Sequence, residues 1–320
     1  MKKGFPEVAL ALSLAVFLPV LLLMMTKEGV QVIPEDDTTQ IVQGIEKERR
    51  TVSVLFDDGI VREQDLDEYV LCVVLAEMPA EFHSEALKAQ AVAGRTYALR
   101  RIKTGNKHGS SVCTDYSCCQ AYCTPELFLS RGESEELLNK VRNAVAETSG
   151  EVLTYNGQYI EATYFSCSGG KTEDAVAVWG AEIPYLKSVY SPGEEFSVHY
   201  TDSITYSLNE FSSRLGFAIP ENATNLVTKT TYTPGGGIDT VQIGGETFTG
   251  MELRTLLELP STSFYITGLG DSVTITSKGF GHRVGMSQYG AQAMAEEGRI
   301  YSDILSHYYP NTILETVTEN

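Results

Sequence analysis

The sequence predicts an α+β fold in which helices and antiparallel hairpins are mixed, preceded by one N-terminal transmembrane helix. The helical segments are segregated from the hairpins, which favours α+β over a doubly wound parallel sheet. An asparagine–glycine pair between two alternating apolar runs predicts a hairpin, and a long apolar run near the start predicts the membrane helix. The 320 residues suffice for one large domain or two modest ones.

The N-terminal apolar run extends from Val8 to Met25, behind Lys2 and Lys3. Its length is close to the ~20 residues that cross a ~30 Å hydrocarbon layer. A cleaved signal peptide is the competing interpretation, but the run ends without the small residues of a cleavage site. We therefore expect an uncleaved anchor over residues 1–26, and the preceding lysines place the rest of the chain outside the cytoplasm.

Helical spacing of apolar residues predicts four longer helices. They cover residues 66–77, 85–102, 135–147 and 287–297. Asp65 is the expected N-cap of the first helix and Ser84 that of the second, while Pro79 ends the first. Two capping boxes, at 207–210 and 249–252, open shorter helices.

Alternating apolar residues predict the strands. These runs are 51–56, 151–155, 158–165, 225–232, 238–243 and 271–277. The pair Asn156-Gly157 joins the second run to the third as a hairpin. The expected domain division is a linker at 27–50, a core at 51–190, an inserted α/β lobe at 191–269 and a C-terminal part of the core at 270–320.

The formal net charge of −18 excludes one class of protein. Proteins that bind nucleic acids present a basic stripe to the phosphate backbone, and this composition cannot supply one. Net charge otherwise informs on solubility and on the electrostatic steering of binding partners, and not on the fold.

Glu77 is the first candidate for chemistry because it ends an apolar helix. The negative end of the helix dipole and the apolar neighbours both disfavour an ionised carboxyl. Both raise its pKa, the direction that a general acid needs near neutral pH. On composition alone, an ordinary solvated glutamate is the favoured interpretation.

A histidine and several cysteines gather in the loop 104–124. They are His108, Cys113, Cys118, Cys119 and Cys123. Imidazole and thiolate ligands at such short spacing suit a tetrahedral zinc ion. Disulfides are the alternative outside the cytoplasm, although neighbours such as Cys118 and Cys119 cannot easily pair and crowded bridges would be strained unless Cys167 took part. Spacing alone favours zinc only slightly.

Two glycine-containing loops complete the candidates. Residues 166–173 expose backbone that a bulky polar ligand could approach, although a flexible loop explains them as well. Residues 279–291 frame a strand-to-helix turn that presents His282 and Arg283, with Ser287 as an N-cap. Alone, this second loop resembles a phosphate loop only weakly, without the pattern of a nucleotide site.

Together these segments resemble the stage II sporulation protein D and amidase-enhancer family. The matching strings are Glu77-Met78-Pro79-Ala80-Glu81-Phe82 with the helix before it, Glu85–Ala98, Cys119-Gln120-Ala121-Tyr122, Ser166–Gly170, Val284–Ala291 and Ile304–Pro310. They span about residues 51 to 315 and keep the family's order, which makes the resemblance specific.

The resemblance implies a peptidoglycan lytic transglycosylase with a glycan-binding cleft, in which Glu77 is the catalytic residue. Such enzymes cut the β-1,4 bond between N-acetylmuramic acid and N-acetylglucosamine and leave a 1,6-anhydromuramic end. The sugar's own C6 hydroxyl is the nucleophile, and an intramolecular group can reach an effective molarity of ~10⁵ M. One carboxylate then suffices, whereas other glycosidases generally need two.

The resemblance also implies site residues beyond Glu77. The expected ligands of a structural zinc ion are His108, Cys113, Cys118 and Cys119. Cys118 stands where a histidine is common, and Cys123 is its possible substitute as the fourth ligand. Arg283 stands where many relatives have glycine. The expected substrate-binding residues are Arg95, Tyr97, Ser166, Ser168, His282, Gln288 and Tyr289.

Membership of this family would place the protein in the cell membrane, with its C-terminal part in the septal space during engulfment. Its partners would be denuded glycan strands, a cell-wall amidase and a polytopic membrane protein. A non-catalytic amidase activator or glycan-binding scaffold is the main alternative, against which the retained Glu77-Met78-Pro79 string argues. A zinc amidase or peptidase is less favoured, because catalytic zinc usually keeps three protein ligands and an open position.

Overall fold

The computed structural model describes residues 50–105, 108–219, 226–267 and 271–317. The expected anchor at 1–26 lies outside these residues, as does the linker except for Arg50. No helix within the described ranges is long and apolar enough to span a bilayer. The chain divides into two units after Glu48, and the description that follows concerns the second unit, Arg49–Asn320.

The elements confirm a mixed α+β fold. The helices are α2 (Leu66–Glu77), α3 (Ser84–Thr104), α4 (Pro125–Ser130), α5 (Glu135–Glu147), α6 (Ala175–Trp179), the 3-10 helix η1 (Glu194–Phe196), α7 (Leu208–Leu215), α8 (Gly250–Leu256), α9 (Gln288–Glu296) and α10 (Tyr301–Tyr308). The strands are β1 (Thr51–Leu55), β2 (Val61–Asp65), β3 (Val112–Cys113), β4 (Glu151–Tyr155), β5 (Gln158–Tyr159), β6 (Tyr164–Phe165), β7 (Thr201–Ser207), β8 (Val227–Tyr232), β9 (Ile238–Ile243), β10 (Glu246–Thr249), β11 (Phe264–Thr267), β12 (Ser272–Lys278), β13 (Met286–Ser287) and β14 (Ile313–Thr316). Small sheets of two or three strands contain mainly antiparallel pairs, with parallel pairing at β1–β3 and β13–β6.

The helix starts follow local capping chemistry. Asp65 accepts hydrogen bonds from the backbone N–H groups of Asp67 and Glu68, so the predicted cap of α2 is confirmed. The predicted cap of α3 is wrong by one residue, because His83 takes that position and its Nδ1 accepts from Glu85 N at 3.2 Å. Ser84 is instead the first helical residue.

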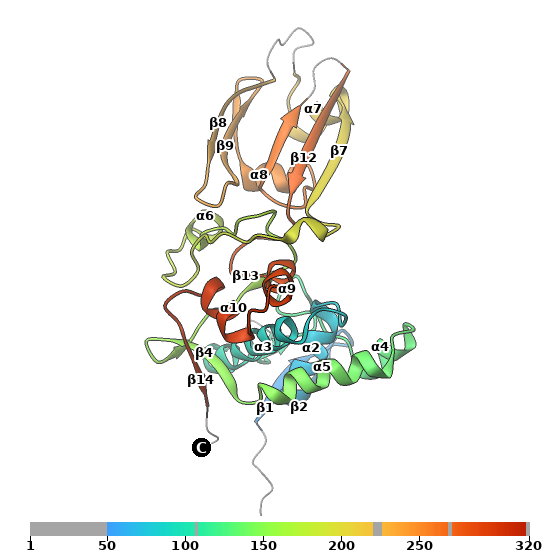
Figure 1. Ribbon diagram of the computed structural model, residues 1–320. Helices are drawn as coiled ribbons and strands as arrows, with labels where there is room; N and C mark the ends of the chain where they lie inside the picture. Colours follow the sequence, from blue (N-terminus) through green and yellow to red (C-terminus); the bar gives the residue numbers. More distant parts are fainter. Residues whose placement is uncertain (1–49, 106–107, 220–225, 268–270, 318–320) are drawn as a thin grey trace, which may run out of the picture. The chain divides into compact units, whose positions relative to one another are not determined.

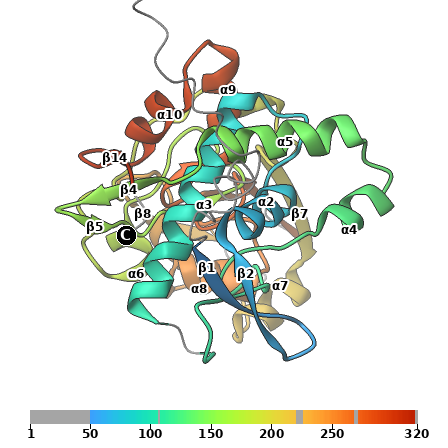
Figure 2. The same cartoon turned by 90° about the horizontal axis from the view of Figure 1, so that it is seen from below.

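Helix α3 is the centre of the larger hydrophobic core. Its residues are buried almost continuously from Ala86 to Leu99, because α2, α5, α9, α10 and β4 all pack against it (Figure 2). A helix enclosed on every side needs small or apolar residues all round, which explains its run of alanines.

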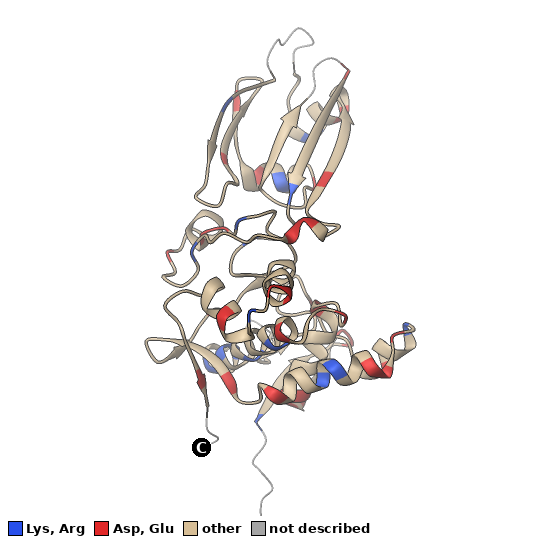
Figure 3. Cartoon of the chain, viewed as in Figure 1, with Lys and Arg blue, Asp and Glu red and all other residues tan. Residues whose placement is uncertain are grey.

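Lysines and arginines are dispersed among the acidic residues of the described elements (Figure 3).

The hairpin at Asn156-Gly157 is confirmed, but its second strand is shorter than predicted. Asn156 and Gly157 have φ values of 50° and 70°, as a two-residue hairpin turn requires, and β4 pairs antiparallel with β5. The predicted single strand over 158–165 is wrong: β5 ends at Tyr159, and the later β6 pairs in parallel with β13. This second pairing brings the loop after Phe165 beside the start of α9.

A second hydrophobic core forms around α7, α8 and the two three-stranded sheets β10-β9-β8 and β11-β12-β7 (Figure 1). Thr249 and Glu252 form a complete capping box at the start of α8. At α7, Ser207 accepts from Glu210 N. The strand predicted at 271–277 contributes Val273 and Ile275 to this core. The division into a core and an inserted lobe at 191–269 stays a prediction.

Arg95 lies inside the larger core. Its guanidinium pairs with Asp67 at 2.9 Å and donates to the backbone oxygens of Val145 and Glu151. These contacts join α2, α5 and β4 to α3, and they leave the side chain 1% exposed. Arg95 therefore acts as an internal cross-link.

Replacing Arg95 by alanine is expected to destabilise the fold by about 3 kcal/mol, because two backbone oxygens and a carboxylate lose a charged hydrogen-bond donor. Urea unfolding measures the change. Arg142→Ala on the exposed face of α5 is the control and should change the free energy of unfolding by less than ~0.5 kcal/mol. Unchanged stability for the Arg95 variant, together with weaker glycan binding, would contradict this assignment.

Candidate active site

A cleft of about 700 Å³ lies at the C-terminal end of α2. Of the residues expected to bind or convert a substrate, its walls contain Glu77, Tyr97, Ser166, His282 and Gln288. Cys118 and Cys119 also line the cleft, so the cysteine loop borders it. Segments that are far apart in the sequence thus meet around Glu77.

Glu77 is half-buried and is the last residue of α2. Its Oε1 accepts a hydrogen bond from Ala121 N at 2.7 Å. Removal from water raises the pKa of the Glu77 carboxyl, and the hydrogen bond from Ala121 N together with the nearby polar side chains of Gln288 and Tyr164 partly opposes this effect. The carboxyl therefore holds its proton to higher pH than a solvated glutamate.

A chain of hydrogen bonds fixes Tyr164 next to this carboxyl. Tyr69 Oη donates to Gln120 Oε1 at 3.0 Å, and Gln120 Nε2 donates to Tyr164 Oη at 2.8 Å. Because the Tyr164 oxygen accepts from Gln120, its own proton is free to point to Glu77. Burial raises the pKa of both tyrosines well above the ordinary value, so both remain protonated donors.

Gln288 begins α9 and is 5% exposed. Its Nε2 has no partner at hydrogen-bond geometry among the described residues, yet the amide lies near enough to Glu77 to lower the pKa of the carboxyl. A buried donor without a partner beside a cleft is an available contact for a ligand oxygen.

His282 is a neutral wall residue. Burial, assisted by the positive charge of Arg254, lowers the pKa of His282 to about 4. Its Nδ1 accepts from Val284 N at 3.1 Å, which assigns the ring proton to Nε2. The ring packs 5.6 Å from Phe165 and 5.5 Å from Trp179. A neutral imidazole does not supply a proton near pH 7.

Three of the expected substrate-binding residues do not line this cleft. Arg95 lies in the core, as described above. Ser168 is fully buried and its hydroxyl donates to Glu194 at 2.7 Å. Tyr289 packs against the rings of Phe82 and Phe196, with centroids 5.1 and 5.3 Å away. Their positions within the sequence motifs could not show that these three residues lie away from the cleft.

Glu194 was not among the residues predicted from the sequence, although it organises one side of the site. Its fully buried carboxylate accepts from the hydroxyls of Ser168, Ser191 and Ser287 and from Gly170 N. The serines belong to three separate segments, so Glu194 joins the loop after β6 to the start of α9. No local pattern marks it, because every partner is distant in the sequence except Ser191.

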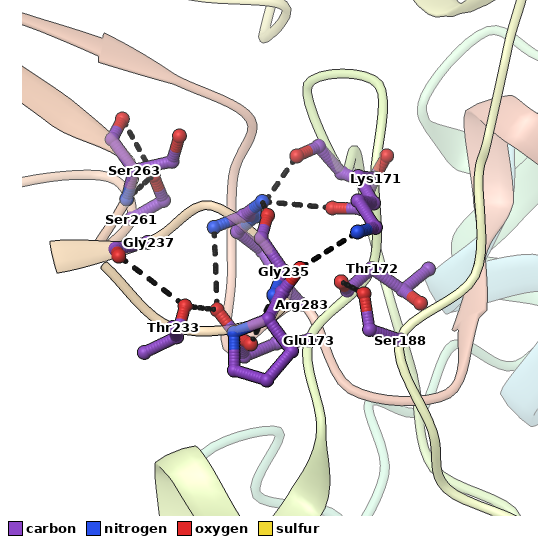
Figure 4. Close-up of polar contacts among 12 residues, drawn as sticks. Lys171, Thr172, Glu173, Ser188, Thr233, Gly235, Gly237, Ser261, Ser263 and Arg283 are labelled. Carbon is purple, nitrogen blue, oxygen red and sulfur yellow. Dashed lines mark hydrogen bonds and ion pairs between the residues drawn. The ribbon is translucent and has the colours of Figure 1, made fainter. Parts of the chain in front are cut away.

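Arg283 is also a structural residue (Figure 4). Its guanidinium donates to the backbone oxygens of Ser168, Lys171 and Gly235 at 2.9, 2.7 and 2.8 Å. Glu173 lies 3.8 Å away and itself accepts from Gly235 N. Arg283 has a φ of 65°, a conformation that favours glycine, so these contacts offset the strain at a position where glycine would be relaxed.

The four expected metal ligands lie together. The ligand atoms of His108, Cys113, Cys118 and Cys119 are all within 4.8 Å of one another. The Sγ atoms of Cys118 and Cys119 are 3.8 Å apart, which matches the ~3.8 Å edge of a tetrahedron with ~2.3 Å zinc–sulfur bonds. His108 Nε2 lies 2.9 Å from Cys118 Sγ, closer than such an edge. The donor set still fits tetrahedral zinc, and the zinc ion itself stays a prediction.

Cys123 lies outside this cluster. It is buried against α2, where its backbone N–H donates to Cys72 O at 2.9 Å and its thiol contacts Arg131. The suggestion that Cys123 replaces Cys118 as a ligand therefore does not agree with the structure. All cysteines of the chain are free thiols, which leaves the disulfide alternative without support.

Comparison with known proteins finds relatives over most of the chain. A family model described as stage II sporulation protein matches residues 57–155. Stage II sporulation protein D of Bacillus subtilis (strain 168) is 44% identical over 253 residues, which cover 77% of this chain and 73% of that protein. The Bacillus amyloliquefaciens protein of the same name is 43% identical over 249 residues, covering 76% and 72%.

A more distant relative is the amidase enhancer of Bacillus subtilis (strain 168), which is 32% identical over 295 residues, covering 76% of this chain and 39% of its own length. The similarity to the two sporulation proteins extends over most of both chains. The chain belongs to the stage II sporulation protein D family.

Proposed function

We propose that this protein is a peptidoglycan lytic transglycosylase that uses Glu77 first as acid and then as base. The observation that carries this proposal is a carboxyl of raised pKa in a cleft with neutral donors around it. A peptidoglycan-degrading role agrees with the family to which the chain belongs.

The second carboxylate of the cleft wall is already engaged. Glu161 accepts hydrogen bonds from the guanidinium groups of Arg100 and Arg101. Both oxygens of its carboxylate therefore already have a partner. A glycosidase that activates water or forms a covalent intermediate needs a second free carboxylate. A nucleophile supplied by the substrate removes that need.

In the proposed reaction, protonated Glu77 gives its proton to O4 of the leaving sugar as the bond from C1 to O4 breaks. The resulting carboxylate takes the proton of the C6 hydroxyl while O6 forms a bond to C1. The product carries a 1,6-anhydro ring, no water is consumed, and Glu77 regains its proton. Ala121 N–H, Tyr164 and Gln288 stabilise the carboxylate between the two steps.

We also propose that His108, Cys113, Cys118 and Cys119 hold a structural zinc ion. Four protein ligands leave no open position for catalysis. The ion would brace the loop that continues directly to Gln120 and Ala121, whose side chain and N–H reach the Glu77 environment. Its contribution to the reaction is therefore indirect, through the position of these donors.

Location and partners extend the proposal. Anchoring by residues 1–26 in the cell membrane would place the cleft in the septal space, where denuded glycan strands are the substrate and a polytopic membrane protein is a neighbour. The amidase enhancer among the relatives supports a link to a cell-wall amidase. It also favours the second candidate function, a non-catalytic amidase activator that binds glycan.

Mass spectrometry of denuded glycan strands tests the transglycosylase. The wild-type protein should release products with 1,6-anhydromuramic ends, and Glu77→Gln should reduce their formation at least ~100-fold, because it removes the transferable proton. Glu161→Gln is the matched control on the same cleft and should retain most of the activity. Its product ends should also be unchanged.

Other product patterns would contradict the proposal in different ways. Reducing-end sugars from the wild type would identify a hydrolase, and loss of activity in Glu161→Gln would identify the second carboxylate. Glycan binding without cleavage by the wild type would favour the amidase activator.

The raised pKa of Glu77 also predicts a pH-dependent stability. Burial favours the protonated carboxyl, so the pKa of Glu77 is higher in the folded protein than in the unfolded chain. The free energy of unfolding of the wild type therefore falls as pH rises from the unfolded pKa of Glu77 through its folded pKa. Glu77→Gln removes this loss and keeps an acceptor for Ala121 N. Thermal unfolding should show equal stability near pH 4 and an advantage of the variant that grows towards pH 8. An advantage independent of pH would contradict the assignment.

Metal analysis tests the zinc site. The wild-type protein should contain one zinc ion per chain, and Cys119→Ser should lower the zinc content sharply because it removes one thiolate ligand. Cys123→Ser is the matched control, since this buried thiol lies outside the cluster, and it should retain the metal. Chelation should reduce activity only as the loop loosens, whereas immediate loss would point to a catalytic ion.

A further inference from the structure

We propose that Trp179 and Phe280 form a sugar-stacking subsite, in which a pyranose ring of a β-1,4-linked glycan packs its C–H face on the exposed rings. The inference rests on the proposed function and extends it from the acid to the recognition of a sugar beside the scissile bond. Neither residue was among the site residues predicted from the sequence, although Phe280 lies in the candidate loop 279–291.

Both rings are exposed where the cleft is open. Trp179 is 43% exposed and Phe280 is 45% exposed, and both line the cleft that contains Glu77. Trp179 is the one tryptophan of the sequence. Large aromatic side chains bury much apolar area when a ligand covers them, and their negative faces attract the weakly positive C–H groups of a sugar.

The framework around Trp179 fixes its position before any ligand arrives. Helix α6 follows Glu173, whose backbone N–H donates to Arg283 O at 2.6 Å, and Ala175 N donates to Leu186 O at 3.0 Å. Behind the indole lies the His282 ring, with centroids 5.5 Å apart. A ring held in this way loses little freedom on binding.

Phe280 lies just after β12 and lines the same cleft. Its backbone N–H donates to Cys167 O at 2.7 Å and its oxygen accepts from Cys167 N at 3.3 Å. The His199 ring packs against it at 4.7 Å between centroids. The buried Glu173–Arg283 pair (Figure 4) therefore supports one side of the subsite, and the Cys167 bridge supports the other.

The chemistry of this wall selects an uncharged, amphipathic ligand. Phe165, Trp179, Phe280 and the neutral His282 present rings without charge, whereas Arg101 and Glu161 pair with each other elsewhere in the cleft. A pyranose ring offers an apolar C–H face and a rim of hydroxyl and amide groups. The hydroxyl of Ser166 in the same cleft can meet that rim.

Tryptophan fluorescence tests the subsite directly. The full chain carrying Glu77→Gln, which prevents turnover, is titrated with a β-1,4-linked N-acetylglucosamine tetramer. The expected result is a saturable change in emission, absent with an α-1,4-linked glucose tetramer. Phe280→Ala in the same background should weaken binding about threefold to tenfold, and Tyr232→Ala, exposed on β8, should leave it unchanged.

Steady-state cleavage of glycan strands gives an independent readout. Trp179→Ala should raise KM about threefold to tenfold with a smaller effect on kcat, and Trp179→Tyr should restore most of the loss. Thermal unfolding checks that the variants are folded. No emission change with the tetramer, or an unchanged KM in Trp179→Ala, would overturn the subsite.

The two proposals fail separately. If Trp179 emission does not change with the tetramer while the protein cleaves glycan through Glu77, the subsite proposal fails and the transglycosylase proposal stands. A saturable response to the tetramer without cleavage by the wild type would keep the subsite and remove the transglycosylase. A response to apolar peptides but not to the tetramer would assign the rings to a protein partner and overturn the subsite.

Discussion

Glu194 places a carboxylate in a fully buried position, where hydrogen bonds from three chain segments converge on it. An ion in such a position is tolerated only when its lone pairs are satisfied. Ser287 donates to Glu194 and at the same time caps α9 by accepting from Gly290 N. Gln288, whose amide reaches Glu77, is the next residue, so the donor geometry of the cleft depends on this buried carboxylate.

The glycines of the Val284–Ala291 motif are explained by the packing around Glu194 and β6. A Cβ on Gly290 would lie 2.1 Å from Tyr308 Oη and 2.2 Å from Ser191 Oγ, inside the polar group around Glu194. A Cβ on Gly285 would lie 2.0 Å from Thr163 O, in a backbone with φ of 86°. Close approach of β6 and β13 therefore requires glycine at position 285, and the packing of α9 against Tyr308 and Ser191 requires it at position 290.

Local signals predicted much of the fold. Helices α2 and α5 and strand β9 have the bounds that apolar spacing indicated, because caps, proline and turn residues act within a few positions. The four metal-ligand candidates were also identified correctly as neighbours, since a short loop brings them together. Arg95, Ser168 and Glu194 could not be placed in this way. Their partners lie on other segments, and the sequence contains no local record of which polar residue is buried against which.

The chemistry proposed for Glu77 requires a compromise that these distant contacts provide. An acid that must later accept a proton needs a pKa near the working pH, because a strongly raised pKa would slow the first transfer and a low one the second. Burial at the end of α2 raises the pKa, while Ala121 N–H, Tyr164 and Gln288 oppose it. Each donor comes from a different support: the cysteine loop, the β6 strand and the helix start held by Glu194. Loosening any one of them shifts the balance towards the protonated acid, so structural residues outside the cleft influence the same proton.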